Sequence, residues 1–238
     1  MANRATLLFA YGNVNDLILA ADGRSTLANG AVGSYNARKL ALCGTRGACA
    51  VGGFCEGIVK EGPRAGWHWR LLDAVAALTK LPTRSASDRA EFVFESAYSS
   101  AAEYMPHDSD PATPGRNDLG ITILYGEVSR MADVYLYRAD MPVTVLEDSD
   151  SKWKWSVDHP VPRAIFPGSD RVGLPFLYLH QPEVHESTNL VAPKDDKVLA
   201  GSLEQMFQLF AQQHAPETVG GRIAAIRIGN DRARWVNA

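Results

Sequence analysis

Short apolar runs alternate with turn-forming segments in the first part of the chain. Residues 6–11 and 17–21 are apolar and flank a segment rich in Gly, Asn and Asp, while residues 39–43 and 48–52 flank a second turn that begins and ends with Gly. Apolar runs of this length, bounded by such turns, are typical of β-hairpins. The pattern therefore predicts two antiparallel hairpins in succession.

A helical period replaces this pattern in the next part. Apolar residues recur at steps of three and four within residues 67–80, with Pro82 just beyond. A second stretch of this kind starts within residues 85–88 and ends near Met105, directly before Pro106. Apolar residues at these steps lie on one face of a helix, and proline cannot continue a helix. We therefore expect two amphipathic helices.

Strands are predicted again in the second half. Residues 119–125, 134–139 and 143–147 are short apolar runs, and the second alternates in part, as an antiparallel strand with one covered face does. Residues 108–118 contain prolines and polar residues and are predicted to be a surface loop. The segment 148–196 carries many prolines and charges with only short apolar pieces, so it is predicted to be mostly loop.

A third helix and a closing hairpin are predicted near the C-terminus. Ser202 and Gln205 have the spacing of a capping box ahead of an apolar stripe, which predicts a helix over residues 203–214. Residues 223–228 and 233–236 flank a Gly-Asn-Asp turn and are predicted to pair as the last hairpin.

The composition fits one globular domain. The 238 residues are 46% hydrophobic and carry 24 Lys and Arg against 27 Asp and Glu, a net charge of −3. The order of elements is α+β and no repeat or linker divides it, so we expect a single domain over residues 1–238. The lack of a basic surplus argues against a nucleic-acid partner. No run approaches the roughly 18 apolar residues that span a bilayer, and no signal peptide is evident, so a cytoplasmic protein without membrane contact is expected.

The cysteines and histidines form no metal or disulfide pattern. Cys43, Cys49 and Cys55 are spaced by six residues, an odd set of thiols without the Cys-x-x-Cys spacing of zinc sites. His180 and His185 lack the helical spacing of a His-Glu-x-x-His site. We expect reduced, buried thiols, no metal and no cofactor.

Four segments carry a resemblance to a known family. They are the strand 6–11, the strand 17–26 with the motif Ala20-Ala21-Asp22-x-Arg24, the pair Arg38-Lys39, and residues 219–223 before the closing hairpin. In element order over nearly the whole chain they resemble a proteasome β-type subunit. The resemblance implies the N-terminal-nucleophile hydrolase fold, a four-layer αββα sandwich with two antiparallel sheets between helical layers.

The resemblance also implies catalytic residues. Thr6 corresponds to the family's nucleophilic threonine, and Asp22 and Lys39 to the aspartate and lysine of its motif. Gly53 corresponds to the glycine of the oxyanion site, and Ser169 to the serine of a glycine-serine element. The implied activity is hydrolysis of peptide or amide substrates, without a cofactor, by a homo-oligomer of the kind that closes into a ring.

The chemistry of such a site follows from its groups. An α-amino group has a pKa of about 7.7–8.0, so an N-terminal Thr6 would carry its own base for the hydroxyl proton. A lysine ammonium nearby disfavours protonation of that amine, which is the role expected of Lys39. Asp22 would compensate the lysine, because an enclosed cation without a partner is costly. The backbone amide of Gly53 would face the developing oxyanion.

Each of these residues also has a simpler interpretation. Thr6 is then an ordinary β-branched strand residue, Asp22 binds its own turn, and Lys39 is solvated at the end of a strand. Only the joint spacing within a matching order of elements favours the catalytic interpretation.

The sequence departs from the family's catalytic members at three positions. Ala5 stands where a glycine is typical before the threonine, and Pro216 and Val219 stand where an aspartate and a serine are expected. Two alternatives therefore remain open. One is a non-catalytic structural subunit for assembly or gating, and the other is a small-molecule amidase of the same fold.

Overall fold

The computed structural model describes residues 6–14, 16–26, 32–107, 120–147, 153–168, 176–180, 184–214 and 219–236. Within these ranges the fold is mixed α+β. Every strand pairing in its two large sheets is antiparallel.

Sheet one contains the first and the last hairpin of the chain. Its strand order is β14-β13-β1-β2-β15-β16. The strands are β1 (Leu8–Gly12), β2 (Asp16–Ala21), β13 (Phe176–His180), β14 (Val184–Ser187), β15 (Ala224–Gly229) and β16 (Ala233–Trp235). Both predicted hairpins are confirmed, since β1 pairs with β2 and β15 with β16.

Sheet two is built around a long central hairpin. Its strand order is β11-β10-β9-β6-β5, and β12 pairs with β10 beside β11. The strands are β5 (Leu40–Cys43), β6 (Gly47–Gly53), β9 (Gly120–Val128), β10 (Val134–Glu147), β11 (Trp153–Val157) and β12 (Val161–Gly168). The predicted hairpin of β5 and β6 is confirmed. The strands predicted at 134–139 and 143–147 are one continuous strand, β10.

Helices and two small hairpins complete the described structure. The helices are α1 (Leu71–Ala76), α2 (Ala86–Tyr104), the 3₁₀ turn η1 (Met105–His107) and α3 (Asp196–His214). The small hairpins are β3 (Ser25–Thr26) with β4 (Val32–Ser34), and β7 (Glu56–Ile58) with β8 (His68–Arg70). Among the described residues, no helix combines the length and the apolar character needed to cross a bilayer.

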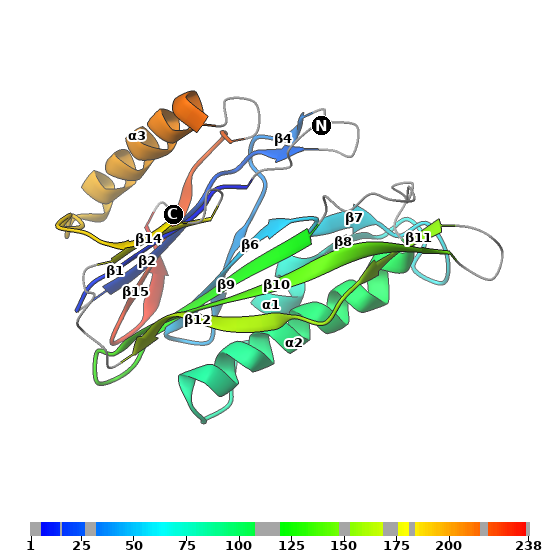
Figure 1. The fold of residues 1–238 in the computed structure, drawn as a ribbon, viewed down its shortest axis with the longest axis horizontal. Coiled ribbons are helices and arrows are strands. Elements are labelled where there is room, and N and C mark those ends of the chain that lie inside the picture. The colour runs from blue at the N-terminus through cyan, green and yellow to red at the C-terminus, as the bar shows by residue number, and fades with distance from the viewer. Residues whose placement is uncertain are drawn as a thin grey trace.

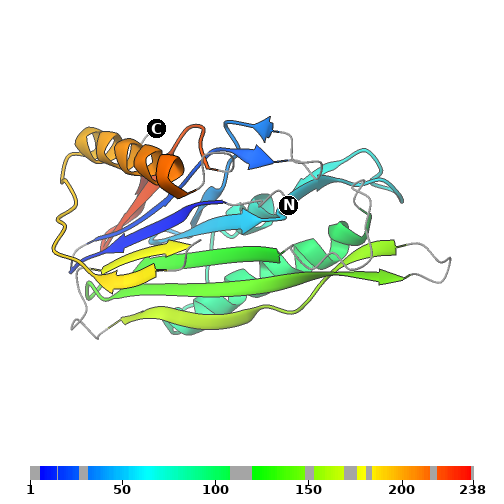
Figure 2. The ribbon, with the colours of Figure 1, turned by 45° about the horizontal axis from the view of Figure 1, so that its top comes forward.

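Three apolar cores lie between these elements, whose layered arrangement is shown in Figures 1 and 2. Phe94 of α2 and Tyr125 of β9 belong to the core between the helices α1 and α2 and sheet two. Leu19 and Leu124 belong to the core that the two sheets share. Phe207 of α3 belongs to the third core, against sheet one. In Figure 1 the two sheets diverge towards the upper right, and β1 begins and β6 ends on that wider side.

The helix predicted over residues 67–80 is wrong at both ends, since α1 covers Leu71–Ala76. His68–Arg70 form β8, in which Trp69 is buried while its two neighbours are exposed. The Leu71 amide donates to the Cys55 carbonyl at 2.8 Å, so the chain leaves the hairpin directly into α1. Pairing with β7 thus outweighs the helical period of the sequence.

For the described part of residues 148–196, which excludes 148–152, 169–175 and 181–183, the prediction of mostly loop is also wrong. This segment contains β11, β12, β13 and β14, and α3 begins at its end. Strand β12 includes Pro162 and Pro167, and it lies at an edge of sheet two. Proline is tolerated on an edge strand because one side of that strand needs no donors. Edge position, which the sequence does not show, therefore decides the structure here.

The start of the third helix was misplaced by the predicted capping box. Asp195, rather than Ser202, caps α3, because its Oδ1 accepts hydrogen bonds from the amides of Lys197 and Val198 at 2.8 and 3.1 Å. The Ser202 hydroxyl instead donates to the Val198 carbonyl within the helix, at 3.0 Å. The helix is accordingly longer than predicted at its N-terminus.

The predicted start of the second helix is confirmed by a complete capping box. The Ser85 hydroxyl accepts a hydrogen bond from the Asp88 amide at 3.2 Å, and the Ser85 amide donates to the Asp88 carboxylate at 3.1 Å. The Ser85 side chain and amide lower the pKa of Asp88.

We expect Ser85→Ala to lower the free energy of unfolding by about 1 kcal/mol, because the first turn of α2 loses its cap. Urea unfolding measures the change. Ser99→Ala, at an exposed position within the same helix, is the control and should be neutral or slightly stabilising. Equal effects of the two substitutions would contradict the role of the cap.

Candidate active site

A buried carboxylate at the end of β2 organises the candidate site. Asp22 is fully buried, and its Oδ1 accepts hydrogen bonds from the Lys39 ammonium at 2.9 Å and from the Leu7 amide at 3.1 Å. Its Oδ2 accepts one from the Gly220 amide at 3.2 Å. Asp22 therefore joins the segment before β1, the segment before β5 and the segment before β15.

Lys39 is the cation that compensates this carboxylate. Its side chain is 5% exposed, and its ammonium donates to the Arg24 carbonyl at 2.6 Å as well as to Asp22. The Lys39 carbonyl accepts the Val51 amide at 2.8 Å, which fixes the residue against β6. Two of the three ammonium donors thus have described partners.

The simpler interpretations of Asp22 and Lys39 are wrong. Asp22 contacts segments distant in sequence rather than its own turn, and Lys39 is buried rather than solvated. Burial raises the pKa of Asp22, while Lys39 and the amides of Gly220 and Leu7 act in the opposite direction. The charged form of the carboxylate therefore depends on these partners.

Thr6 lies two residues before the first residue of β1 and reaches towards sheet two. It is 7% exposed, and a Cβ atom placed on Gly52 would lie 3.2 Å from the Thr6 Cβ. The alternation of a strand explains this contact, because Leu8 and Ala10 on the same face belong to the core between the sheets. Gly52 lacks a side chain, so the backbone of β6 can approach Thr6 closely.

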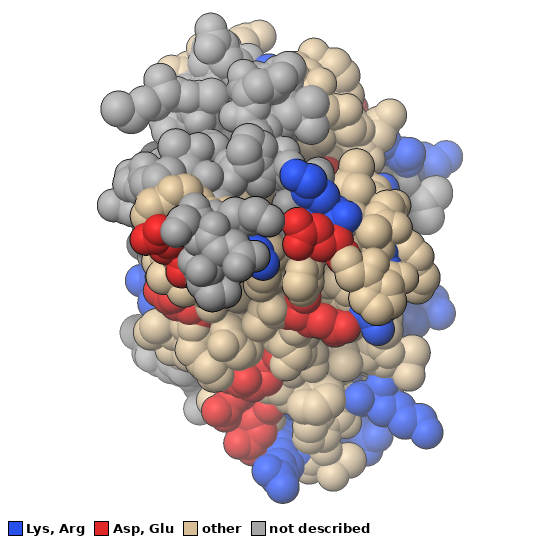
Figure 3. Space-filling model, turned by 90° about the vertical axis from the view of Figure 1, so that its right-hand side faces the viewer, with Lys and Arg blue, Asp and Glu red and all other residues tan. Residues whose placement is uncertain are grey.

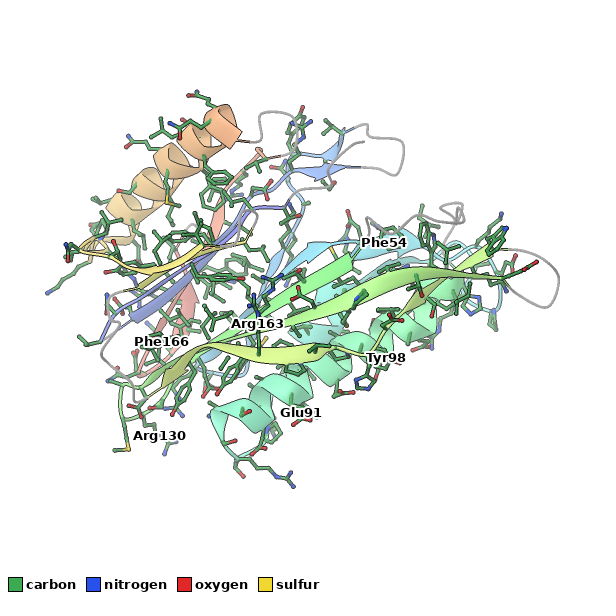
Figure 4. All side chains as sticks on the ribbon, viewed as in Figure 1. Phe54, Glu91, Tyr98, Arg130, Arg163 and Phe166 are labelled. Atoms are coloured by element: carbon green, nitrogen blue, oxygen red, sulfur yellow. The ribbon has the colours of Figure 1, made fainter. Side chains whose placement is uncertain are left out.

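Gly53 follows at the end of β6 and requires glycine. Its φ is +85°, and a Cβ atom there would collide with the Gly120 carbonyl. The next residue is anchored, since Phe54 contacts Trp155 with ring centroids 5.5 Å apart (Figure 4). The structure thus brings four of the five predicted residues, Thr6, Asp22, Lys39 and Gly53, to one region. Gly53 follows Gly52 in the chain, and Gly52 lies against Thr6.

The remaining family positions are only partly described. Ser169, the fifth predicted residue, lies outside the described residues, as do Ala5 and Pro216. Val219 is described and is 4% exposed, within the core of α3 and sheet one. Its apolar side chain offers no hydroxyl beside the Gly220 amide that contacts Asp22.

A polar cluster next to this region was missed by the sequence reasoning. Thr122 pairs in register with the glycine beside Thr6, and its hydroxyl donates to Asp140 Oδ1 at 2.8 Å. Arg138 donates to the same carboxylate and, at 2.9 Å, to the Tyr178 hydroxyl of sheet one. The alternation of β10 was the available signal, since it places Arg138 and Asp140 on the face that also carries core residues.

None of Cys43, Cys49 and Cys55, all three of which the structure describes, forms a disulfide. Cys43 and Cys49 are buried, and Cys55 is half-buried. Burial raises the pKa of the Cys49 thiol, which keeps it in the unreactive neutral form. Within the described ranges, His, Cys, Asp and Glu form no group of three or more that could hold a metal.

The end of the molecule in Figure 3 carries both acidic and basic side chains.

Comparison of the chain with models of protein families found no match, and comparison with curated proteins found none either.

We expect Lys39→Met to lower the free energy of unfolding by about 3–5 kcal/mol, because it leaves the buried Asp22 carboxylate without its cation. Lys80→Met, at an exposed position, is the control and should change it by less than about 0.5 kcal/mol. Adding Asp22→Asn to Lys39→Met should recover part of the loss. Additive losses in urea unfolding would show that the two residues are not coupled.

The loss caused by Lys39→Met should depend on pH. Removing Lys39 takes away the main influence that lowers the pKa of Asp22, so this pKa rises further above the unfolded value of about 3.9. A carboxyl group whose pKa is higher in the folded state than in the unfolded state lowers the free energy of unfolding as the pH rises above the unfolded pKa. We therefore expect a larger loss at pH 7 than at pH 4.5. A loss that grows towards acidic pH would contradict this assignment.

Proposed function

We propose that the protein is an N-terminal-nucleophile hydrolase of amide bonds, similar to proteasome β-type subunits, in which Thr6 becomes the first residue and acts as the nucleophile. One observation carries the proposal. The Lys39 ammonium and the Leu7 amide, directly after Thr6, share one oxygen of the buried Asp22. The buried cation and the residue after Thr6 thereby share one partner, which supports a role for Lys39 near Thr6.

The arrangement of layers supports the same conclusion. The cores between α3 and sheet one, between the sheets, and between sheet two and α1 with α2 follow one another through the molecule. We propose that they represent the four-layer αββα sandwich of this class of hydrolases. In Figure 1, β1 begins and β6 ends on the same side of the molecule. Thr6, two residues before β1 and against Gly52 of β6, then lies between the two sheets of this sandwich.

The proposed reaction needs a free amine on Thr6, and so the bond between residues 5 and 6 must first be hydrolysed. The amine then takes the proton of the Thr6 hydroxyl, directly or through a water molecule, as the oxygen attacks the substrate carbonyl. The carbon–nitrogen bond breaks, the amine product leaves with that proton, and an ester on Thr6 remains. Water hydrolyses the ester and restores the hydroxyl.

Lys39 and Gly53 support these steps. We propose that the third donor of the Lys39 ammonium faces Thr6, where its charge disfavours protonation of the α-amine. The Gly53 amide is the proposed donor to the oxyanion, at a position whose conformation only glycine adopts readily. Ser169 remains a prediction from the family resemblance. We propose that Asp140, whose side chain is 41% exposed and binds the Thr122 hydroxyl, contacts the substrate.

The proposed substrates, cellular location and assembly follow from the family resemblance. The protein would act on peptides or simple amides as a cytoplasmic homo-oligomer, with the ring as the expected assembly. No cofactor is needed by this mechanism.

A non-catalytic structural subunit of the same fold is the second candidate. Val219 favours it, because a buried apolar side chain stands where catalytic members of the family carry a serine. The Asp22–Lys39 pair would then serve stability alone.

We expect Thr6→Ala to abolish amide hydrolysis, lowering kcat/KM by about 10³-fold or more, because the nucleophile is lost. Thr6→Ser should retain activity, and the exposed Thr79→Ala should match the unchanged protein. Rates on short peptides and on simple amides measure the effect and separate a peptidase from a small-molecule amidase. Full activity of Thr6→Ala would exclude Thr6 as the nucleophile.

The mass of the purified protein separates the two candidates. A catalytic protein should begin at Thr6 and react covalently with an electrophilic inhibitor at that residue. A chain that retains residue 5 and hydrolyses neither peptides nor simple amides supports the structural subunit.

A further inference from the structure

Two polar contacts connect the sheets on opposite sides of the chain that leads from Thr6 into β1. On one side, Asp22 directly follows β2 of sheet one and binds Lys39, which directly precedes β5 of sheet two. On the other side, Arg138 of β10 donates a hydrogen bond at 2.9 Å to the hydroxyl of Tyr178 in β13. Strand β1 lies between β13 and β2, while β6 and β9 lie between β10 and β5. The two contacts therefore flank β1.

The strand register places the second contact close to the level of Thr6. Gly52 lies against Thr6. Within sheet two, Gly52 pairs with Thr122, which pairs with Asp140. Neighbouring strands are about 4.8 Å apart, so this row from β6 to β10 measures about 10 Å. Arg138 lies two residues before Asp140 on the same face of β10 and binds its carboxylate. A continuous set of hydrogen bonds therefore connects the row beside Thr6 to sheet one.

The contact between Arg138 and Tyr178 is removed from solvent. Tyr178 is fully buried in the core that the sheets share, and the side chain of Arg138 is 11% exposed. The Asp140 carboxylate accepts from Nε and Nη2 of the guanidinium, which leaves Nη1 directed at the Tyr178 hydroxyl. A hydrogen bond from a charged donor is stronger than a neutral one, and it is costly to break away from water. Separation of the sheets at this point is therefore unfavourable.

The apolar packing of β6 leaves part of this task to polar contacts. Strand β6, which the structure describes in full, presents only Ala48, Ala50 and Gly52 to the core between the sheets. Small side chains bury little apolar surface, so they contribute less to the attraction between two sheets than large ones. Contacts on the flanks of β6 therefore carry a larger share of it here.

We propose that Arg138 and Tyr178 are positioning residues for Thr6, whose hydrogen bond keeps the sheets together beside Thr6 and so holds this residue against β6. The ion pair at the end of β2 acts in the same way from the other side. In the proposed hydrolase the contact fixes the nucleophile relative to the oxyanion donor at the end of β6. This catalytic consequence rests on the proposed function, whereas the control of access to position 6 does not.

Alkylation of a thiol at position 6 tests the contact without any need for hydrolysis. Thr6 is 7% exposed, so reaction of a Thr6→Cys variant with iodoacetamide requires the sheets to separate locally. In this background Tyr178→Phe removes the hydroxyl and keeps the ring. The loss of one hydrogen bond to a charged group should raise the alkylation rate about tenfold. Tyr98→Phe is the control and should leave the rate unchanged, because Tyr98 belongs to α2 on the other face of sheet two (Figure 4). Peptide mass mapping measures the rate at each thiol.

The native cysteines separate a local effect from a general loss of stability. Cys43 and Cys49 are fully buried in the core between sheet two and its helices. A general loss of stability raises the alkylation rate at these thiols too, whereas loss of the proposed contact raises it at position 6 alone.

A second variant tests whether the two residues act as one contact. Arg138→Gln removes the charged donor and should raise alkylation at position 6 to a similar extent. Tyr178→Phe added to Arg138→Gln should raise it little further, because the contact is already lost. Multiplication of the two effects would show that the residues act separately and would contradict the proposal.

The outcomes for this contact and for the proposed function are distinct. Faster alkylation at position 6 alone supports the contact whether or not the protein hydrolyses amides. An unchanged rate in Tyr178→Phe, or an equal rise at the buried native thiols, overturns it, even when Thr6→Ala shows that Thr6 is the nucleophile. Where amides are hydrolysed, Tyr178→Phe should lower kcat about tenfold with KM nearly unchanged, because the nucleophile rather than the substrate is displaced. An unchanged kcat would overturn the positioning role.

Discussion

The ion pair between Asp22 and Lys39 is the interaction on which the candidate site depends. A carboxylate removed from water is costly, and here one oxygen is shared by a cation and a backbone amide while the other accepts a second amide. The pair therefore fixes the positions of three chain segments relative to one another. A loss of either charge would disturb all three, and with them the start of β1.

The position of Thr6 follows from this arrangement and from the alternation of a strand. Leu7 is held by Asp22, so the side chain before it points to the opposite face, towards sheet two. Gly52 offers only backbone at that point. The same geometry would serve a nucleophile or a tightly packed structural residue. The two differ in the Thr6 nitrogen, which is a free amine in the nucleophile and part of a peptide bond in the structural residue.

Much of the fold could be predicted from sequence, because hairpins and helices with regular apolar periods are determined locally. The hairpin of β1 and β2 and the start of α2 within residues 85–88 are examples. Strand β12 could not be predicted, since it is an edge strand that contains two prolines. The Asp22–Lys39 pair was reached through family spacing. The contact between Arg138 and Tyr178 depends on two sheets meeting, which no local pattern contains.

The prolines of β12 have a consequence for the behaviour of the protein in concentrated solution. On β10, Pro162 pairs with Ala139 and Pro167 pairs with Tyr135. A bulge at Ile165 adds one residue to β12 between the two prolines, so both occupy equivalent positions in the strand pairing. Because an N–H is missing at both positions, an incoming strand from another molecule would find two gaps in the row of donors along this border. The strand thus ends the sheet and discourages its growth into fibrous aggregates.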